Sequence, residues 1–246
     1  MVYNAENRLN ERGVGVRYTD IYKAVFIRRL NRFTAEIETN GGTELCHVKN
    51  TGRLKELLLP KATVFVQRAD SPNRKTKWDL IAVQTDEQIV NIDSQAPNRA
   101  VKEWLEKGGL GKVRIIRPET VYTEADGTSS RFDFYIEFEN GEKAFAEVKG
   151  VTLKCGSAAL FPDAPTERGI KHVRGLCDCV KNGYKAYVLF AVQMQGISCF
   201  MPNDKTHSAF GEALRKAKQE GVQILAYSCT VLPDSMEMKE EIPVKL

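Results

Sequence analysis

The chain has 246 residues, of which 42% are hydrophobic and 28% are charged, a balance that supports a packed core and excludes wholesale disorder. No apolar run approaches the roughly 20 residues of a membrane-spanning helix, and the first residues have no apolar stretch typical of a secretory signal. The six cysteines include no C-x-x-C pair, which argues against a zinc ribbon or a redox motif. We therefore expect a cytoplasmic protein with reduced thiols, without a membrane partner or a disulfide-linked partner.

The net charge of +4 is unevenly distributed along the chain. Residues 1–90 contain 15 Lys and Arg against 11 Asp and Glu, whereas residues 91–246 contain 21 of each. This mild bias suggests that the first third of the chain contacts a polyanion. The alternative is an ordinary solvated surface.

A polar extension over residues 1–19 precedes a region of short runs rich in Val, Ile, Phe, Tyr and Thr, the residues that favour strands. The predicted strands cover residues 22–28, 33–39, 44–48, 63–68, 78–85 and 88–92. Only residues 54–59 have a helix-like pattern. Because closure removes exposed strand edges, we predict an OB-like β-barrel over residues 20–93, with a small sandwich as the alternative.

The hydrophobic period changes after residue 92, which places the domain boundary near residues 93–97. Helices are predicted over residues 98–107, 165–181 and 208–220, and strands over residues 113–122, 132–138, 143–151, 184–192, 197–201 and 222–228. The order α-β-β-β-α-β is that of the PD-(D/E)xK nuclease fold. We therefore predict a two-domain α+β or α/β protein whose second domain, residues 98–246, is nuclease-like.

The residues most informative for chemistry lie in a predicted hairpin over residues 132–151. Glu147 and Lys149 are two residues apart on one strand, so their side chains share a face. A three-residue loop at residues 139–141 with a left-handed Gly141 places Asp133 across from Glu147, whereas a two-residue turn places it on the other face. The hydrophobic pattern favours the three-residue loop, because that register places the apolar Ala144, Ala146 and Val148 opposite the apolar face formed by Phe132, Phe134, Ile136 and Phe138.

Two carboxylates so close repel each other unless a proton or a cation lies between them. Hard divalent cations take oxygen ligands, so Asp133 and Glu147 are predicted to bind Mg²⁺ or Mn²⁺. Lys149 would then position or deprotonate a water at the metal, or stabilise developing charge, which is the chemistry of phosphodiester hydrolysis. The alternative is a surface hairpin with ordinary salt bridges.

Glu119, near the end of the preceding predicted strand, is a third acidic candidate for the catalytic set. Glu124 and Asp126 compete with it for this role, although residues 125–130 have the composition of a loop. The predicted catalytic residues are therefore Asp133, Glu147, Lys149 and Glu119.

Basic side chains near aromatic ones indicate contacts with a nucleic acid, which needs phosphate neutralisation and offers bases for stacking. The predicted DNA contacts are Arg28, Arg29, Arg53, Arg74, Lys75 and Lys77 in the barrel and Arg168, Lys171 and His172 on one side of the helix over residues 165–181. A solvated surface is again the alternative. Phe26 and Phe33 are expected in the barrel core, and the lone His47 is expected to be structural.

Three segments carry a resemblance to a known family: Asn50-Thr51-Gly52, the run EVKGVTL at residues 147–153, and the run LFPDAPTERGIKH at residues 160–172. Over about residues 20–246 the chain resembles the sugar fermentation stimulation protein family (SfsA); residues 1–19 depart from it. The resemblance implies an OB-like domain, a PD-(D/E)xK-type domain, DNA binding and a link to carbohydrate-metabolism genes. It assigns nuclease-like roles to Asp133, Glu147 and Lys149, with Glu119 as the upstream acid.

Three functions stay open from the sequence: a DNA-acting hydrolase, a DNA-binding regulator that keeps the nuclease fold as a scaffold, and a polyanion-binding module with no role on DNA. No helix-turn-helix pattern is present, so we expect largely sequence-independent binding to the phosphate backbone. Whether the protein is an Mg²⁺-dependent endonuclease or phosphodiesterase is left open by the sequence. The oligomeric state is open too, with a homo-oligomer among the alternatives.

Overall fold

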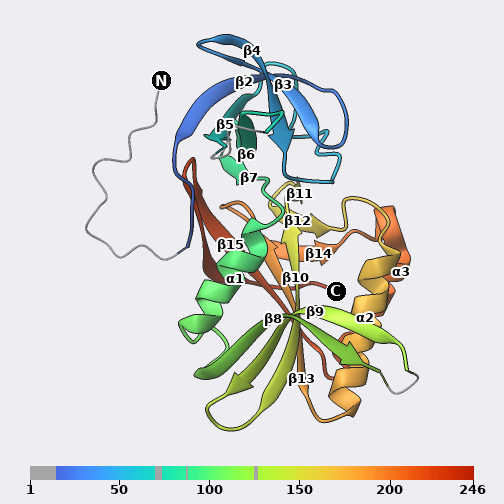
Figure 1. Ribbon diagram of the computed structural model, residues 1–246. Coiled ribbons are helices and arrows are strands. Elements are labelled where there is room, and N and C mark those ends of the chain that lie inside the picture. The colour runs from blue at the N-terminus through green and yellow to red at the C-terminus, as the bar shows by residue number, and fades with distance from the viewer. Residues whose placement is uncertain (1–14, 70–73, 87, 125–126) are drawn as a thin grey trace. The chain divides into compact units, whose positions relative to one another are not determined.

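The computed structural model describes residues 15–69, 74–86, 88–124 and 127–246 (Figure 1). The chain divides into two compact units. The first contains the described residues up to Ala100 together with Gln193–Gln195 and Cys229–Met238, and the second contains Val101–Val192, Gly196–Ser228 and Lys239–Leu246.

The first unit contains a closed barrel, as the sequence predicts. Its strands are β2 (Ile21–Arg29), β3 (Thr34–Thr39), β4 (Gly42–Val48), β5 (Thr63–Arg68), β6 (Trp78–Gln84) and β7 (Ile89–Asn91). They follow the order β4-β3-β2-β5-β6-β7, and an additional parallel pairing between β4 and β6 closes the sheet. This closure leaves fewer strand edges with unpaired backbone groups.

Two local predictions for the barrel are wrong. Residues 54–59 form turns rather than a helix: Leu54 has a left-handed φ of 50°, and the amides of Leu57 and Leu58, which both bond to its carbonyl, close a single turn that does not continue. Phe26 lies in the core with 2% of its surface exposed, as expected, but Phe33 is 50% exposed. Phe33 precedes β3, so the inward alternation of that strand does not include it.

The predicted loose extension contains an ordered part. Strand β1 (Val16–Arg17) pairs antiparallel with the beginning of β16 (Ser235–Ile242), and Tyr18 is buried. The sequence could not indicate this pairing, because a strand of two residues has no detectable alternation. Residues 1–14 of that extension lie outside the described residues.

The large sheet has the order β1-β16-β15-β13-β10-β9-β8. Its further strands are β8 (Val113–Thr123), β9 (Ser129–Phe138), β10 (Lys143–Val151), β13 (Lys185–Val192) and β15 (Gln223–Leu232). Strands β10, β13 and β15 are parallel, whereas β8, β9 and β10 form an antiparallel meander. With helix α1 (Ala96–Glu106) before β8 and helix α2 (Glu167–Lys181) before β13, the predicted α-β-β-β-α-β order holds for the strands of this sheet, although two short strands of another sheet lie between β10 and α2.

Helices α2 and α3 (Asp204–Gln219) pack against each other, and α2 lies on strands β9, β10 and β13 (Figure 1). A small sheet of order β11-β12-β14 completes the second unit, with strands Leu153–Cys155, Ala158–Phe161 and Cys199–Pro202. Strands β11, β12 and β16 were not predicted, since the first two are very short and the third is rich in charged residues. No helix of the described residues is long and apolar enough to cross a membrane, and the six cysteines, all described, are free thiols.

The hairpin of β9 and β10 adopts the predicted register. Gly141 has a φ of 86°, and the pairs run from Lys143↔Glu137 to Ala146↔Phe134. These pairs correspond to the three-residue loop rather than to a two-residue turn. The next position along each strand is Glu147 on β10 and Asp133 on β9.

Candidate metal centre and nucleic-acid contacts

Asp133 and Glu147 meet where the pairing of β9 and β10 ends. One Asp133 carboxylate oxygen, Oδ2, accepts a 2.7 Å hydrogen bond from the backbone amide of Val148. A side chain thus takes the place of a backbone acceptor, which ties the Asp133 carboxylate to the strand segment that carries Glu147. The structure therefore brings these two predicted residues together.

Glu147 is buried, with 3% of its surface exposed, and its two carboxylate oxygens have different surroundings. Oε1 accepts a 2.6 Å hydrogen bond from Lys149 Nζ and lies 2.5 Å from His172 Nδ1. Oε2 is buried and has no hydrogen-bond partner among the described residues. A buried carboxylate oxygen without a partner is costly, and Oε2 is the oxygen that Glu147 could offer to a ligand.

The surroundings keep Glu147 ionised at neutral pH. Burial raises the pKa of the Glu147 carboxyl, but the hydrogen bond from His172 and the charge of Lys149 outweigh burial and hold that pKa below its ordinary value. The site thus holds a carboxylate whose charge a cation can meet.

Helix α2 carries His172 to Glu147, and its sequence explains how. The hydroxyl of Thr166 caps the helix by accepting a 3.0 Å hydrogen bond from the amide of Gly169. A Cβ at Gly175 would lie 2.9 Å from Ser130 Oγ and 3.1 Å from Phe132 Cζ, so only glycine lets the helix approach β9 this closely. Residues 166–169 (TERG) and Gly175 therefore determine where the helix lies.

His172 was predicted as a DNA contact, and the structure contradicts this, because its ring is buried with 6% of its surface exposed. Its partner is Glu147. The sequence contained a signal for this burial, since His172, Leu176 and Cys179 follow the i, i+4, i+7 spacing of a buried helix face and all three are buried.

The predicted grouping of Phe132 with Phe134 is also wrong. Phe145 and Glu147 are two residues apart on β10 and share a face. The ring of Phe132 packs on Phe145, with centroids 5.5 Å apart, and on His172, the partner of Glu147, at 6.1 Å. Phe132 therefore lies on the Glu147 face, and the alternation along β9 breaks close to Asp133.

Glu119 does not join the central pair. It has a left-handed φ of 49°, its side chain is 70% exposed, and it lies 3.4 Å from Arg131 in an exposed ion pair. Glu124 accepts a hydrogen bond from the Ser130 hydroxyl, and Asp126 lies outside the described residues. Within residues 15–69, 74–86, 88–124 and 127–246, no group of three or more His, Cys, Asp and Glu side chains is arranged to hold a metal ion. The candidate centre therefore rests on Asp133 and Glu147.

Three of the predicted basic contacts in the barrel already have partners within the first unit. Arg28 pairs with Glu36 at 2.7 Å, and Arg74 holds the buried Asp79 through two hydrogen bonds of 3.0 and 2.6 Å. The guanidinium of Arg29 is directed at backbone carbonyl groups, and burial lowers its pKa. These partners leave the three arginines fewer free donors for phosphate than the sequence suggested.

The other predicted contacts are exposed. Arg53 and Lys75 are exposed, and Lys77 is 77% exposed with Glu44 3.7 Å away. On α2, Arg168 and Lys171 are exposed, and Lys171 Nζ donates to the carbonyl of Ser129 at 3.1 Å. These five side chains can reach a polyanion.

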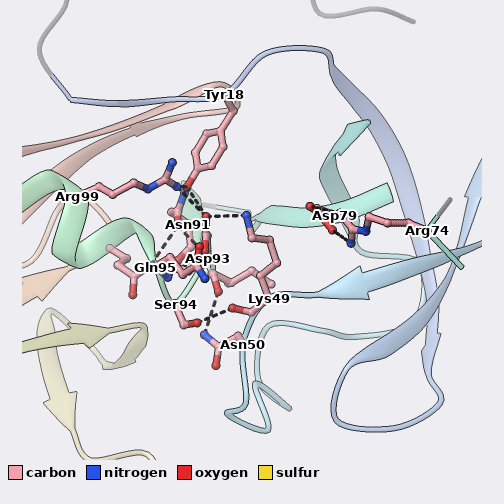
Figure 2. Close-up of polar contacts among 12 residues, drawn as sticks. Tyr18, Lys49, Asn50, Arg74, Asp79, Asn91, Asp93, Ser94, Gln95 and Arg99 are labelled. Atoms are coloured by element: carbon pink, nitrogen blue, oxygen red, sulfur yellow. Dashed lines mark hydrogen bonds and ion pairs between the residues drawn. The ribbon is translucent and has the colours of Figure 1, made fainter. Parts of the chain in front are cut away.

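A further buried carboxylate is Asp93 in the first unit, which no sequence pattern had indicated. Figure 2 shows Tyr18, Lys49 and Arg99 converging on it. Asp93 Oδ2 accepts from the Tyr18 hydroxyl at 3.1 Å and from Arg99 at 2.9 Å, and Lys49 Nζ lies 3.4 Å away. Asp93 Oδ1 accepts from the amide of Gln95 at 2.9 Å. Each oxygen has a protein partner, so this cluster is structural.

Comparisons with known proteins give the chain a family. The family models described as "SfsA N-terminal OB domain" and "Sugar fermentation stimulation protein RE domain" match residues 27–92 and 95–235. The chain belongs to the sugar fermentation stimulation protein family. The predicted resemblance is thereby confirmed, and so is the fold class of an OB-like barrel followed by a nuclease-like domain.

Relatives cover almost the whole chain. The sugar fermentation stimulation protein homolog of Clostridium beijerinckii is 50% identical over 232 residues, which are 94% of this chain and 100% of the relative. That of Desulfitobacterium hafniense is 51% identical over 231 residues, 94% of this chain and 99% of the relative. The solved structure of Pyrococcus furiosus SfsA in complex with Ca²⁺ is 27% identical, with a TM-score of 0.84, and the match covers 95% of this chain and 100% of that one.

Proposed function

We propose that this protein binds DNA through its phosphate backbone and hydrolyses phosphodiester bonds at a divalent-cation site made by Asp133 and Glu147. The observation that carries the proposal is the buried Oε2 of Glu147, which has no hydrogen-bond partner in the described structure. It belongs to a residue whose strand neighbour binds the Asp133 carboxylate.

The donor set fits Mg²⁺ or Mn²⁺. Two carboxylates on adjacent strands supply hard oxygen ligands, and Mg²⁺ in proteins is commonly held by one or two carboxylates with the remaining positions left for water and substrate phosphate. The relative from Pyrococcus furiosus is described as a complex with Ca²⁺, another oxygen-seeking cation, which supports the same ligand class here.

A cation bound there would polarise a phosphoryl oxygen and lower the pKa of a bound water. The chain's own residues divide the remaining tasks. His172 holds Glu147 through Oε1, so that Oε2 keeps one orientation. Lys149, 17% exposed in its side chain, reaches the same carboxylate and can donate to charge that develops on the attacked phosphate.

The substrate is DNA, whose backbone consists of phosphodiester bonds, and the basic surfaces of the protein support this assignment. The exposed Arg168 and Lys171 lie on α2, the helix that carries His172 to the site. The excess positive charge of the chain is confined to residues 1–90. Because phosphate contacts carry no base information, we expect steep salt dependence and little discrimination between duplex sequences.

The test separates metal binding from cleavage. Calorimetric titration with Mn²⁺ should show binding to the wild type and to Glu137→Gln, and none to Glu147→Gln. Glu137 is the matched control, a buried glutamate of the same sheet whose carboxylate is held by Tyr135 and Arg114. Incubation of single-stranded, duplex and branched DNA with Mg²⁺, Mn²⁺ or EDTA should give products only with the metals. Equal Mn²⁺ binding by wild type and Glu147→Gln would refute the site.

A second candidate function is a regulator of carbohydrate-metabolism genes that binds DNA without cutting it. The outward position of Glu119 favours it, because the third acidic residue expected of a nuclease site pairs with Arg131 instead. If the protein binds the metal but cleaves none of the DNA forms, the result favours the regulator over the hydrolase.

A further inference from the structure

Arg29 joins two loops of the barrel. Its guanidinium has five N–H donors, and all five are directed at backbone oxygens over distances of 2.5–3.2 Å. The acceptors are the carbonyl groups of Asn31, Arg32, Asn50, Gly52 and Arg53. One side chain thereby fixes the loop over residues 30–33 against the loop over residues 50–53.

The joined loops are strongly basic. Residues 28–33 and 49–55 together contain six Lys and Arg and no Asp or Glu. Three of these cations have partners described above, in Glu36, Asp93 and the backbone carbonyl groups. The side chains of Arg32, Arg53 and Lys55 are exposed, and none of the three forms an ion pair with a described residue. The charge of this surface is therefore left for a polyanion.

Phe33 stands on this basic surface with half of its area exposed. Its backbone is held at both ends, because its amide donates to Asn31 Oδ1 at 2.9 Å and its carbonyl accepts from the Val48 amide at 2.9 Å. The ring of His47 lies alongside, with the planes inclined by 22° and the centroids 6.4 Å apart. An exposed aromatic ring on a fixed backbone, beside cations without ion-pair partners, is an arrangement that can bind a base and its phosphates together.

We propose that the two loops joined by Arg29 capture an unpaired nucleotide of a DNA strand, with Phe33 stacking on the base and Arg32, Arg53 and Lys55 facing the phosphates. The proposal rests on the DNA binding proposed above and names the form of DNA that the barrel prefers. A duplex keeps the faces of its bases inside the stack, so only an unpaired base offers a face to Phe33.

Fluorescence anisotropy in EDTA, where metal-dependent cleavage cannot occur, tests the preference. The probes are a labelled oligo-dT strand, an abasic strand of the same length, and a duplex of that length. Phe33→Ala should weaken binding of oligo-dT about tenfold and change duplex and abasic binding by less than about twofold. Phe33→Tyr should retain wild-type affinity. Val121→Ala removes another exposed apolar side chain, 60% exposed on β8, and should change nothing.

Each outcome has one meaning. Wild-type protein that binds none of the three probes overturns the proposed DNA binding, and the inference with it. Wild-type protein that binds all three while Phe33→Ala retains full oligo-dT affinity overturns the inference and leaves DNA binding intact. Equal losses on oligo-dT and the abasic strand also overturn it, since they show that Phe33 does not contact a base. Quenching of 2-aminopurine in a bound strand, lost in Phe33→Ala, would support stacking directly.

Discussion

The two units each contain a buried carboxylate surrounded by basic groups, and the two differ in one respect. In the first unit, both oxygens of Asp93 have protein partners: Tyr18 and Arg99 at Oδ2, and the Gln95 amide at Oδ1. In the second unit, Lys149 and His172 both contact Oε1 of Glu147, and Oε2 has no hydrogen-bond partner in the described structure. A saturated buried carboxylate stabilises a fold, whereas an unsaturated one keeps a position for a ligand.

Removal of Asp93 should have the largest effect on stability. In Asp93→Ala, the Tyr18 hydroxyl loses its acceptor, and Lys49 and Arg99 lose the anion that compensates them. We expect the free energy of unfolding to fall by about 3 kcal/mol, measured by urea denaturation. The estimate is at the lower end of the range because the Arg99 side chain is 46% exposed.

Glu38→Ala, an exposed carboxylate of the same barrel, serves as the control and should change the free energy of unfolding by less than about 0.5 kcal/mol. A loss in Asp93→Ala no larger than in this control would show that the Asp93 cluster does not hold the first unit together.

Gly175→Ala should destabilise the second unit by about 2 kcal/mol. The new methyl group would lie 2.9 Å from Ser130 Oγ and 3.1 Å from the Phe132 ring, so α2 must move away from β9. The higher helix propensity of alanine offsets about 1 kcal/mol of a larger steric cost. Arg174→Ala, exposed on the same helix, should leave the thermal midpoint nearly unchanged. Unchanged stability of Gly175→Ala would mean that the contact of α2 with β9 is loose.

His172→Leu should weaken Mn²⁺ binding about tenfold, because Glu147 loses the donor that orients it. His172→Asn places an amide donor near the position of Nδ1 and should recover most of the affinity. Titration calorimetry on the two variants distinguishes orientation of Glu147 from simple filling of the core. If both variants bind Mn²⁺ as wild type does, His172 has no part in holding the ligand.

The sequence predicted the parts of the molecule that depend on local pattern. The barrel strands, the parallel strands and the loop at Gly141 all follow from alternation and turn chemistry, and the register that brings Asp133 to Glu147 follows from them. Apart from residues 54–59, Phe33 and Phe132, the misses concern contacts between segments far apart in the chain. Neither the burial of Asp93 nor the five carbonyl groups around Arg29 leaves a local pattern.

For His172, the sequence contained two conflicting signals. Its helical spacing with Leu176 and Cys179 indicated a buried position, while its neighbours Arg168 and Lys171 suggested a charged surface. A histidine fits either environment, so the pattern alone could not decide between them. The identity of its partner depends on how α2 packs on β10, which only the structure shows.

Glu147→Gln should have a smaller effect on stability than Asp93→Ala or Gly175→Ala, and it decides the comparison of the two carboxylates. The amide oxygen can still accept from Lys149 and His172, but Lys149 loses the anion that compensates it, and the new amide NH2 group at the Oε2 position has no acceptor in the described structure. We expect the free energy of unfolding without metal to fall by about 1 kcal/mol, which is less than in Asp93→Ala because both acceptor contacts at Oε1 remain. Added Mn²⁺ should raise the thermal midpoint of the wild type, since a ligand that binds only the folded state stabilises it, and should leave Glu147→Gln unmoved. If Glu147→Gln instead lost as much stability as Asp93→Ala, Glu147 would be a structural residue like Asp93, and its unpartnered oxygen would carry no function.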